Sequence, residues 1–441
     1  MISRWGPYTD MRSLRNAEPI VIDHAQGIYV WDETGKKYLD AHAGLWLANV
    51  GYGRQEIHEA IRTQAERLSW FSSFGGFANR PSLDLAERLH RLFAPDDMAT
   101  VFFSNDGSEA VETALKLSRE YWKLMGRPGK TKLIGRHYAY HGVTMGALSV
   151  AGITANRRLF EPLLADVRHA PSPYQNHCSF HDGETPCTMA CARELERIIR
   201  FEDPATVAAF IAEPVQAAGG VVFPPADYLA QVRAICQRYD VLFIADEVVT
   251  GFGRLGEWSG SRHYHIQPDM MTFAKGITSG YLPLGATAVS PRIFEAFVQN
   301  SHEPGPEFRH GNTYSGHPLA CAVALANIDI LEKEDLLSNA AKQGRHLQEQ
   351  LQKLKQEFPD DIADAQGEGL LGRVELWPES EQSVGRRGER ASEMMKAKGV
   401  IVRPVGDVIT LSPPLIISQD EIDIVMTALH DALTDMKKSG L

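Results

Sequence analysis

Apolar residues along this chain form two patterns, short continuous runs and longer segments with helical spacing. The short runs are rich in residues that favour strands, and several lack polar positions, as strands buried on both faces do. Strands are predicted at 100–103, 131–135, 207–212, 241–245, 270–274 and 285–290. Helices are predicted at 54–69 and 82–93, from the turn at 104–109 to about 125, and at 225–239. Strands that alternate with helices predict an α/β fold with a mostly parallel sheet.

Both ends of the chain have a different pattern. Alternating residues near the start predict an antiparallel meander with strands at 20–23, 28–31 and 37–39. Beyond it, the C-terminal elements are predicted as helices 318–333, 337–356, 386–397 and 419–437, a strand 370–376, and a hairpin of 400–403 with 408–411. We therefore predict an N-terminal arm with part of a small domain (1–60), a large domain (61–325) and a C-terminal small α+β domain (326–441).

Composition narrows the class of protein. The chain has 441 residues, of which 44% are hydrophobic and 23% charged, as in ordinary soluble proteins. Its net charge of −11 argues against a nucleic-acid surface. We find no run of about 18 apolar residues and no secretory leader, so we expect no membrane span and a cytoplasmic location. The five cysteines are expected to be reduced thiols.

One cysteine- and histidine-rich segment raises the question of a metal site. It contains His177, Cys178, His181, Cys187 and Cys191. The spacing lacks a Cys-x₂-Cys pair, and Pro, Gly and Ser in the segment are typical of a surface loop. We favour a loop with incidental thiols, and we expect no metal.

Two of the predicted strands end on a charged residue, Asp246 in one and Lys275 in the other. Ligands bind at the carboxyl edge of open α/β sheets, and a pyridoxal phosphate site uses both an acid and a lysine. These two residues alone leave other interpretations open. Asp246 could cap a helix or bind Mg²⁺, and single lysines often follow strands.

Other segments also allow two interpretations. The turn at 104–109 joins a strand to a helix N-terminus, which is a favourable place for an anion, but an ordinary capped helix explains it equally. With one glycine it matches neither the Walker A loop nor the dinucleotide fingerprint. Trp46 in a glycine-rich loop, and the aromatic loop 70–77, could be core or could line a pocket.

Six motifs, taken together and in order, carry a family resemblance. They lie at 104–110, 140–142, 213–216, 246–254, 274–276 and 313–318. With them the chain resembles, over essentially its whole length, the class III (subgroup II) pyridoxal-phosphate aminotransferases. The resemblance implies fold type I, with a seven-stranded, mostly parallel sheet in the large domain. Within the family the chain is most similar to ω-transaminases that use pyruvate, through segments 45–53 and 278–285.

The resemblance implies a role for each matching residue. Lys275 would form the Schiff base and then shuttle the proton, and Asp246 would hold the pyridine nitrogen. The other cofactor residues would be Gly107 and Ser108 at the phosphate, Tyr140 and Val248 on the two ring faces, His141 and Glu213 nearby, and Thr313 at the phosphate of the partner subunit's cofactor. Arg403 would bind the substrate carboxylate, and the apolar pocket walls would be Trp46, Phe74, Phe77 and Tyr138.

The implied function is a homodimeric transaminase that moves an amino group from a primary amine or ω-amino acid to pyruvate by a ping-pong mechanism. Donors that fit include β-alanine, diamines and aryl-alkyl amines. The main alternative is a 2-oxoglutarate-dependent enzyme of the ornithine or 4-aminobutyrate type, in which Glu213 and Arg403 would gate the carboxylate. A dialkylglycine decarboxylase and a non-catalytic cofactor-binding protein are further alternatives.

Overall fold

The computed structural model describes residues 5–12, 19–178, 180, 189–299 and 307–438. Its large sheet contains β4 (Thr100–Ser104), β5 (Lys132–Arg136), β6 (Val167–Ala170), β7 (Val207–Ala212), β8 (Leu242–Asp246), β9 (Met270–Phe273) and β10 (Gly285–Val289). The seven strands lie in the order β4-β10-β9-β8-β7-β5-β6. The strand pairs from β9 to β6 are all parallel, and β10 pairs antiparallel with both β9 and β4. The predicted α/β fold with a mostly parallel seven-stranded sheet is confirmed.

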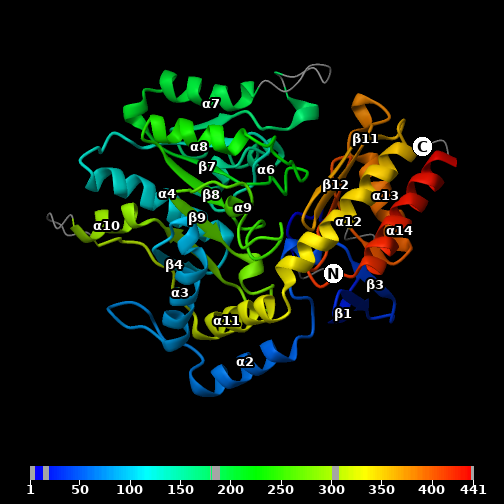
Figure 1. The fold of residues 1–441 in the computed structure, drawn as a ribbon, viewed down its shortest axis with the longest axis horizontal. Helices are drawn as coiled ribbons and strands as arrows, with labels where there is room; N and C mark the ends of the chain where they lie inside the picture. Colours follow the sequence, from blue (N-terminus) through cyan, green and yellow to red (C-terminus); the bar gives the residue numbers. More distant parts are fainter. Residues whose placement is uncertain (1–4, 13–18, 179, 181–188, 300–306, 439–441) are drawn as a thin grey trace.

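Helices cover both faces of this sheet (Figure 1). The helices in the first part of the chain are α1 (Ala43–Trp46), α2 (Gln55–Arg67), α3 (Arg80–Phe93), α4 (Gly107–Leu124), α5 (Met145–Val150), α6 (Thr154–Arg157), α7 (Ala190–Phe201), α8 (Tyr228–Arg238), α9 (Gly260–His263) and α10 (Pro291–Gln299). Ile211 and Ile244 pack with α4, α5 and α10, whereas their neighbours Phe210 and Phe243 pack with α7 and α8. Successive strand residues thus face opposite helical layers, which explains the uninterrupted apolar runs.

Two smaller sheets lie on the other side of the molecule from α7 and α8 (Figure 1). Their strands are β1 (Ile22–Gln26), β2 (Tyr29–Asp32), β3 (Lys37–Asp40), β11 (Ile362–Glu368), β12 (Leu371–Leu376), β13 (Val400–Ile401), β14 (Arg403–Val405) and β15 (Val408–Leu411). The sheet orders are β1-β2-β3-β13 and β11-β12-β15-β14. The helices around them are α12 (Leu336–Glu357), α13 (Arg386–Ala397) and α14 (Gln419–Lys438), whereas α11 (Pro318–Lys333) packs on α2 and α3.

The predicted hairpin of 400–403 with 408–411 is wrong in its first strand. Val400 and Ile401 pair in parallel with β3 in the N-terminal sheet, whereas Arg403–Val405 pairs with β15. The chain changes sheets at Val402, whose side chain is buried in the core. Pro404 is compatible with β14 because that strand lies at the sheet edge. The change of sheet places Arg403 at the beginning of an edge strand.

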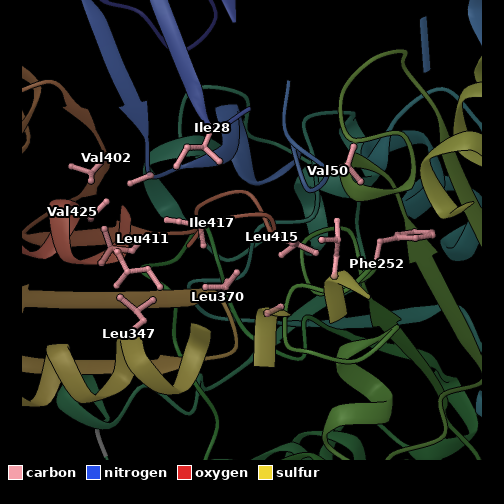
Figure 2. Packing of buried hydrophobic residues seen from close by; sticks show 14 of the residues in the cluster. Ile28, Val50, Phe252, Leu347, Leu370, Val402, Leu411, Leu415, Ile417 and Val425 are labelled. Carbon is pink, nitrogen blue, oxygen red and sulfur yellow. The ribbon is translucent and has the colours of Figure 1, made fainter. Parts of the chain in front are cut away.

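One large core joins the two ends of the chain. Figure 2 shows Ile28 and Leu347 on either side of Leu411, with Leu415 between these residues and Phe252. All five belong to one cluster of buried side chains. The pairing of β3 with β13 likewise joins N- and C-terminal segments. The boundaries at 60/61 and 325/326 stay a prediction. Among the described helices, none is both long and apolar enough to cross a membrane.

The cysteine- and histidine-rich segment is only partly described. His181 and Cys187 lie outside the described residues. His177 Nε2 lies 2.7 Å from Glu375 Oε1, and Cys191, a residue of α7, is buried in the core. In the described part of the chain, no three His, Cys, Asp or Glu side chains are grouped as metal ligands would be.

Candidate active site

The carboxyl edge of the large sheet borders a cavity of about 690 Å³. Asp246 ends β8, and Lys275 follows β9 by two residues. The predicted site residues that line this cavity are Trp46, Gly107, Ser108, Tyr140, His141, Glu213, Asp246, Val248, Lys275 and Arg403. A mostly apolar cavity of this size, with a few polar groups that converge, is typical of a cofactor or substrate site.

Asp246 presents an oriented carboxylate in the cavity. Its Oδ2 lies 2.6 Å from His141 Nδ1, and its Oδ1 accepts hydrogen bonds from Val248 N (3.1 Å) and Thr272 Oγ1 (3.2 Å). The side chains of Asp246 and His141 are 3% and 0% exposed. No α-helix begins at Asp246, so the helix-cap interpretation is not needed. A buried, aligned acid of this kind can hold a protonated ring nitrogen.

Lys275 has the properties of an activated amine. Its pKa is lowered to about 8, mainly by burial; Asp246 and Glu213 oppose this shift, and the positive charge of Arg403 contributes to it. Its backbone is left-handed, with φ of 49°. Such strain in a non-glycine residue is concentrated at functional sites. A lysine with a lowered pKa is a usable nucleophile and proton carrier.

Glu213 supports the segment that carries Tyr140. Its Oε1 accepts a hydrogen bond from Tyr140 N (3.0 Å), and its Oε2 accepts one from Ala217 N (3.1 Å). Burial raises the pKa of Glu213 to about 7, with a contribution from Asp246. Burial also raises the pKa of the Tyr140 hydroxyl. Near neutral pH the Glu213 carboxyl is therefore protonated in part of the molecules.

The beginning of α4 provides a cradle for an anion. Asp106 caps the helix by accepting a hydrogen bond from Glu109 N at 2.9 Å. No hydrogen bond to another described residue engages the N–H groups of Gly107 and Ser108, which line the cavity. Free N–H groups at the positive end of a helix dipole are suited to a phosphate. The anion interpretation of this turn is thus compatible with a capped helix.

Gly107 and Gly142 line the cavity at positions where a side chain would crowd neighbouring residues. A Cβ on Gly107 would lie 3.1 Å from both methyl groups of Val248. A Cβ on Gly142 would lie 2.6 Å from Ser108 Oγ, and the φ of Gly142 is +128°. The anion cradle, the aligned acid and the lysine together fit pyridoxal phosphate, because that molecule carries a phosphate, a basic ring nitrogen and an aldehyde.

Trp46 and Arg403, two of the predicted substrate residues, line the cavity together with Lys275. The Trp46 ring centroid lies 5.5 Å from Lys275 Nζ and 5.4 Å from Arg403 Cζ. Among the described residues, the groups that act electrostatically on the Arg403 guanidinium are the Tyr140 and Tyr8 hydroxyls, and no acid forms an ion pair with it. Both distances fall within the range of cation–π contacts.

Four other predicted site residues do not line the cavity of this chain. Phe74 and Phe77 are 52% and 60% exposed, and Thr313 is also exposed. Phe74 lies next to Gly311, in the same surface region as Thr313. Tyr138 packs on Tyr174 with ring centroids 5.5 Å apart, outside the cavity lining.

Other cavity residues were missed from the sequence. They are mainly the arm residues Pro7 and Tyr8, the apolar positions Leu45, Ile153 and Leu282–Leu284, and Asn156. Tyr8 belongs to the N-terminal arm, where it is an aromatic residue without periodic context. No local pattern could bring this arm to the sheet edge, since its position depends on contacts distant in sequence.

The family follows from a comparison with known proteins. Residues 12–433 match the profile of the class III aminotransferases. The chain belongs to the class III aminotransferases. This confirms the expected family, its fold type and pyridoxal 5′-phosphate as the cofactor, and it makes the protein a transaminase.

This aminotransferase is similar to proteins whose names give different substrates. It is 39% identical over 434 residues to a putrescine–pyruvate aminotransferase of Pseudomonas aeruginosa, covering 97% of this chain and 93% of that protein. It is 40% identical over 428 residues to a diaminobutyrate–2-oxoglutarate transaminase of Halomonas elongata, covering 94% and 90%. A solved amine transaminase from an uncultivated Pseudomonas species, in its pyridoxal-phosphate-bound form, shares 41% identity with a TM-score of 0.94 over 99% of each chain.

Proposed function

We propose that this class III aminotransferase transfers an amino group from a primary amine or ω-amino acid to pyruvate in two half-reactions. The observation that carries the proposal is the joint position of Lys275, Trp46 and Arg403 around one cavity. A cation faces an apolar ring there, so the site can accept either a carboxylate or an uncharged group. The similar putrescine–pyruvate aminotransferase and amine transaminase support this substrate class.

Different residues around the cavity would bind the cofactor, hold its ring and transfer the proton. When bound, pyridoxal phosphate supplies a ring that accepts the electrons released at the substrate carbon. Asp246, which is aligned by His141, would hold a proton on the ring nitrogen. Gly107 and Ser108 would bind the phosphate, and Tyr140 and Val248 would hold the ring. Lys275 Nζ would accept the proton released at the substrate carbon, because its lowered pKa leaves the amine partly neutral.

Arg403 gives the site its two substrate modes. Its planar guanidinium binds a carboxylate through two parallel hydrogen bonds, a geometry that lysine cannot offer. In the other half-reaction the amine substrate can lack a carboxylate. Its alkyl or aryl group then lies against the apolar lining, which includes Trp46, Leu45 and Val215.

We also propose a homodimer in which the partner copy completes the site. An aromatic surface supports this proposal, because Trp70 packs on Tyr314 (6.2 Å) and Phe71 on Phe77 (5.3 Å) while all four side chains remain exposed. Exposed apolar patches mark association surfaces. Thr313 of each subunit would then reach the phosphate of the partner's cofactor.

We also propose a cytoplasmic location, which the buried free thiols Cys236 and Cys321 support.

The second candidate function is transfer to 2-oxoglutarate, which the similarity to the diaminobutyrate–2-oxoglutarate transaminase of Halomonas elongata supports. That enzyme type would use a pair of Glu213 and Arg403 as a gate. In the described structure Glu213 accepts backbone N–H groups from Tyr140 and Ala217 instead. This arrangement favours pyruvate.

An acceptor screen tests the proposal. The purified holoenzyme is given one amine, for example putrescine, with either pyruvate or 2-oxoglutarate, and alanine and glutamate are quantified. We expect alanine to form at a kcat/KM at least about tenfold above that of glutamate, a difference of about 1.4 kcal/mol in transition-state binding. Strict dependence on 2-oxoglutarate would overturn the pyruvate assignment in favour of the second candidate.

A further inference from the structure

The turn that carries Trp46 has an unusual backbone. Ala43, Gly44 and Trp46 all have positive φ, at 47°, 67° and 57°. Alanine and tryptophan rarely adopt this conformation, and each such residue persists only where the surroundings enforce it. Trp46 is nevertheless 4% exposed and lines the cavity. Contacts outside the turn must therefore hold this conformation.

Asp40 supplies those contacts. Its Oδ1 accepts a hydrogen bond from His42 N at 3.0 Å, and its Oδ2 accepts one from Gly44 N at 2.6 Å. The Tyr52 hydroxyl donates to the same Oδ2 at 2.7 Å. Asp40 is 3% exposed, so these bonds act where water competes little. Tyr52 is fixed in turn by backbone hydrogen bonds to Gly27.

The position of the indole depends on this backbone. Trp46 Nε1 is buried and makes no hydrogen bond to a described residue. The edge of the ring meets His42, with centroids 4.2 Å apart, and the ring lies 5.5 Å from Lys275 Nζ and 5.4 Å from Arg403 Cζ. A rotation of the turn would therefore change the contact of the indole with both cations.

We propose that Asp40 and Tyr52 are positioning residues for substrate selection. The Asp40 carboxylate, held by the Tyr52 hydroxyl, holds the 43–46 turn in place and so fixes the distance of the Trp46 indole from Lys275 and Arg403. The indole then limits the size of the amine that fits beside the cofactor. This inference rests on the proposed function, in which Trp46 and Arg403 contact the substrate.

A purely structural role for Asp40 predicts something different. Its backbone pairs with Ile401 where β3 joins β13, so a substitution could act through the fold alone. Asp32 offers a matched control in the same sheet. Its carboxylate accepts hydrogen bonds from the Tyr38 hydroxyl (2.9 Å) and from Thr34 N (3.0 Å), and Asp32 does not line the cavity.

The test compares Asp40→Asn and Tyr52→Phe with Asp32→Asn and Tyr38→Phe in the holoenzyme. The first readout is the ratio of kcat/KM for a bulky aryl-alkyl amine to that for a small alkyl amine. Loss of charge-assisted hydrogen bonds should release the indole and raise this ratio by about tenfold in Asp40→Asn. In a Trp46→Ala background the same substitution should change it by less than about twofold, because coupled residues are not additive.

The second readout needs no turnover. For each variant, the emission spectrum of Trp46 is obtained by subtraction. The fluorescence spectrum of the same protein with Trp46→Phe is subtracted from that of the protein with Trp46. We expect this emission to move to longer wavelength in Asp40→Asn, as the buried ring becomes exposed, and to stay unchanged in Asp32→Asn. If Asp40→Asn does not fold, Tyr52→Phe, which removes one hydrogen bond, carries the test.

Three results would overturn the inference. They are equal changes in the Asp40 and Asp32 variants, an Asp40→Asn variant with wild-type ratio and emission, and an Asp40 effect that persists without Trp46. A failure of the proposed function looks different. If the acceptor is 2-oxoglutarate, the amine ratio and the Trp46 emission can still be measured and still judge Asp40.

Discussion

Substitution of Arg403 by leucine separates the two substrate modes of the site. The guanidinium lines the cavity, 5.4 Å from the Trp46 ring, and no acid among the described residues pairs with it. Its charge is therefore available for a carboxylate. A hydrogen bond to a charged group contributes about 1.5–3 kcal/mol. Because Arg403 is accessible to solvent, we take about 2 kcal/mol, which corresponds to about a 30-fold rise in KM for pyruvate.

The matching assay measures KM for pyruvate and kcat/KM for an amine without a carboxylate in the same Arg403→Leu protein. The amine value should change by less than about threefold, because Arg403 offers that substrate no charge partner. Arg403→Lys keeps the positive charge but loses the geometry for two parallel hydrogen bonds. Its KM for pyruvate should therefore lie between those of the wild type and Arg403→Leu. Equal losses for pyruvate and amine, or an unchanged KM for pyruvate, would refute the assigned role.

Three further predictions concern the cofactor residues. Lys275→Ala should abolish transamination in a coupled alanine assay, and wild-type turnover in that variant would contradict the assignment of Lys275. Gly142→Ala should raise the Kd for pyridoxal phosphate, measured by absorbance titration, because the new Cβ would lie 2.6 Å from Ser108 Oγ. An unchanged Kd would contradict the assignment of this region to the phosphate. Glu213 has its pKa raised to about 7 by burial, so the native state binds its proton more tightly than the unfolded chain. The free energy of unfolding of the cofactor-free protein should therefore fall as pH rises from about 4.5 to 7. Urea titrations at a series of pH values measure this dependence, and Glu213→Gln should make it weaker. A pH dependence unchanged by the substitution would contradict the raised pKa.

The sequence predicts the central sheet well because burial on both faces leaves an unmistakable apolar pattern. The runs that became β7 and β8 lie between two helical layers, and each was located to within about a residue. β11 was missed because Asp364, Gln366 and Glu368 give it a polar sequence, and only its pairing with β12 makes it a strand. The change of sheet at Val402 was missed for the same reason, since partner choice is a tertiary property.

Some cavity residues could be predicted from the sequence and others could not, because only some of them are positioned by local structure. Residues at strand ends and helix starts, such as Asp246, Lys275 and Gly107, are placed by local structure, so motifs suffice to find them. Tyr8 comes from an arm without periodicity, and its place in the cavity depends on contacts far along the chain. The role of Asp40 could not be read from sequence, because it requires the hydrogen bonds to the 43–46 turn.

A half-reaction in the absence of keto acid tests the account most directly. Excess putrescine is added to the yellow holoenzyme, the absorbance band of the bound cofactor is followed, and pyruvate is then added; Lys275→Ala serves as the control. We predict that the amine removes the band and that pyruvate restores it with release of alanine. A band that persists with putrescine, β-alanine and aryl-alkyl amines alike, or that only 2-oxoglutarate restores, would contradict the proposed amine–pyruvate transamination.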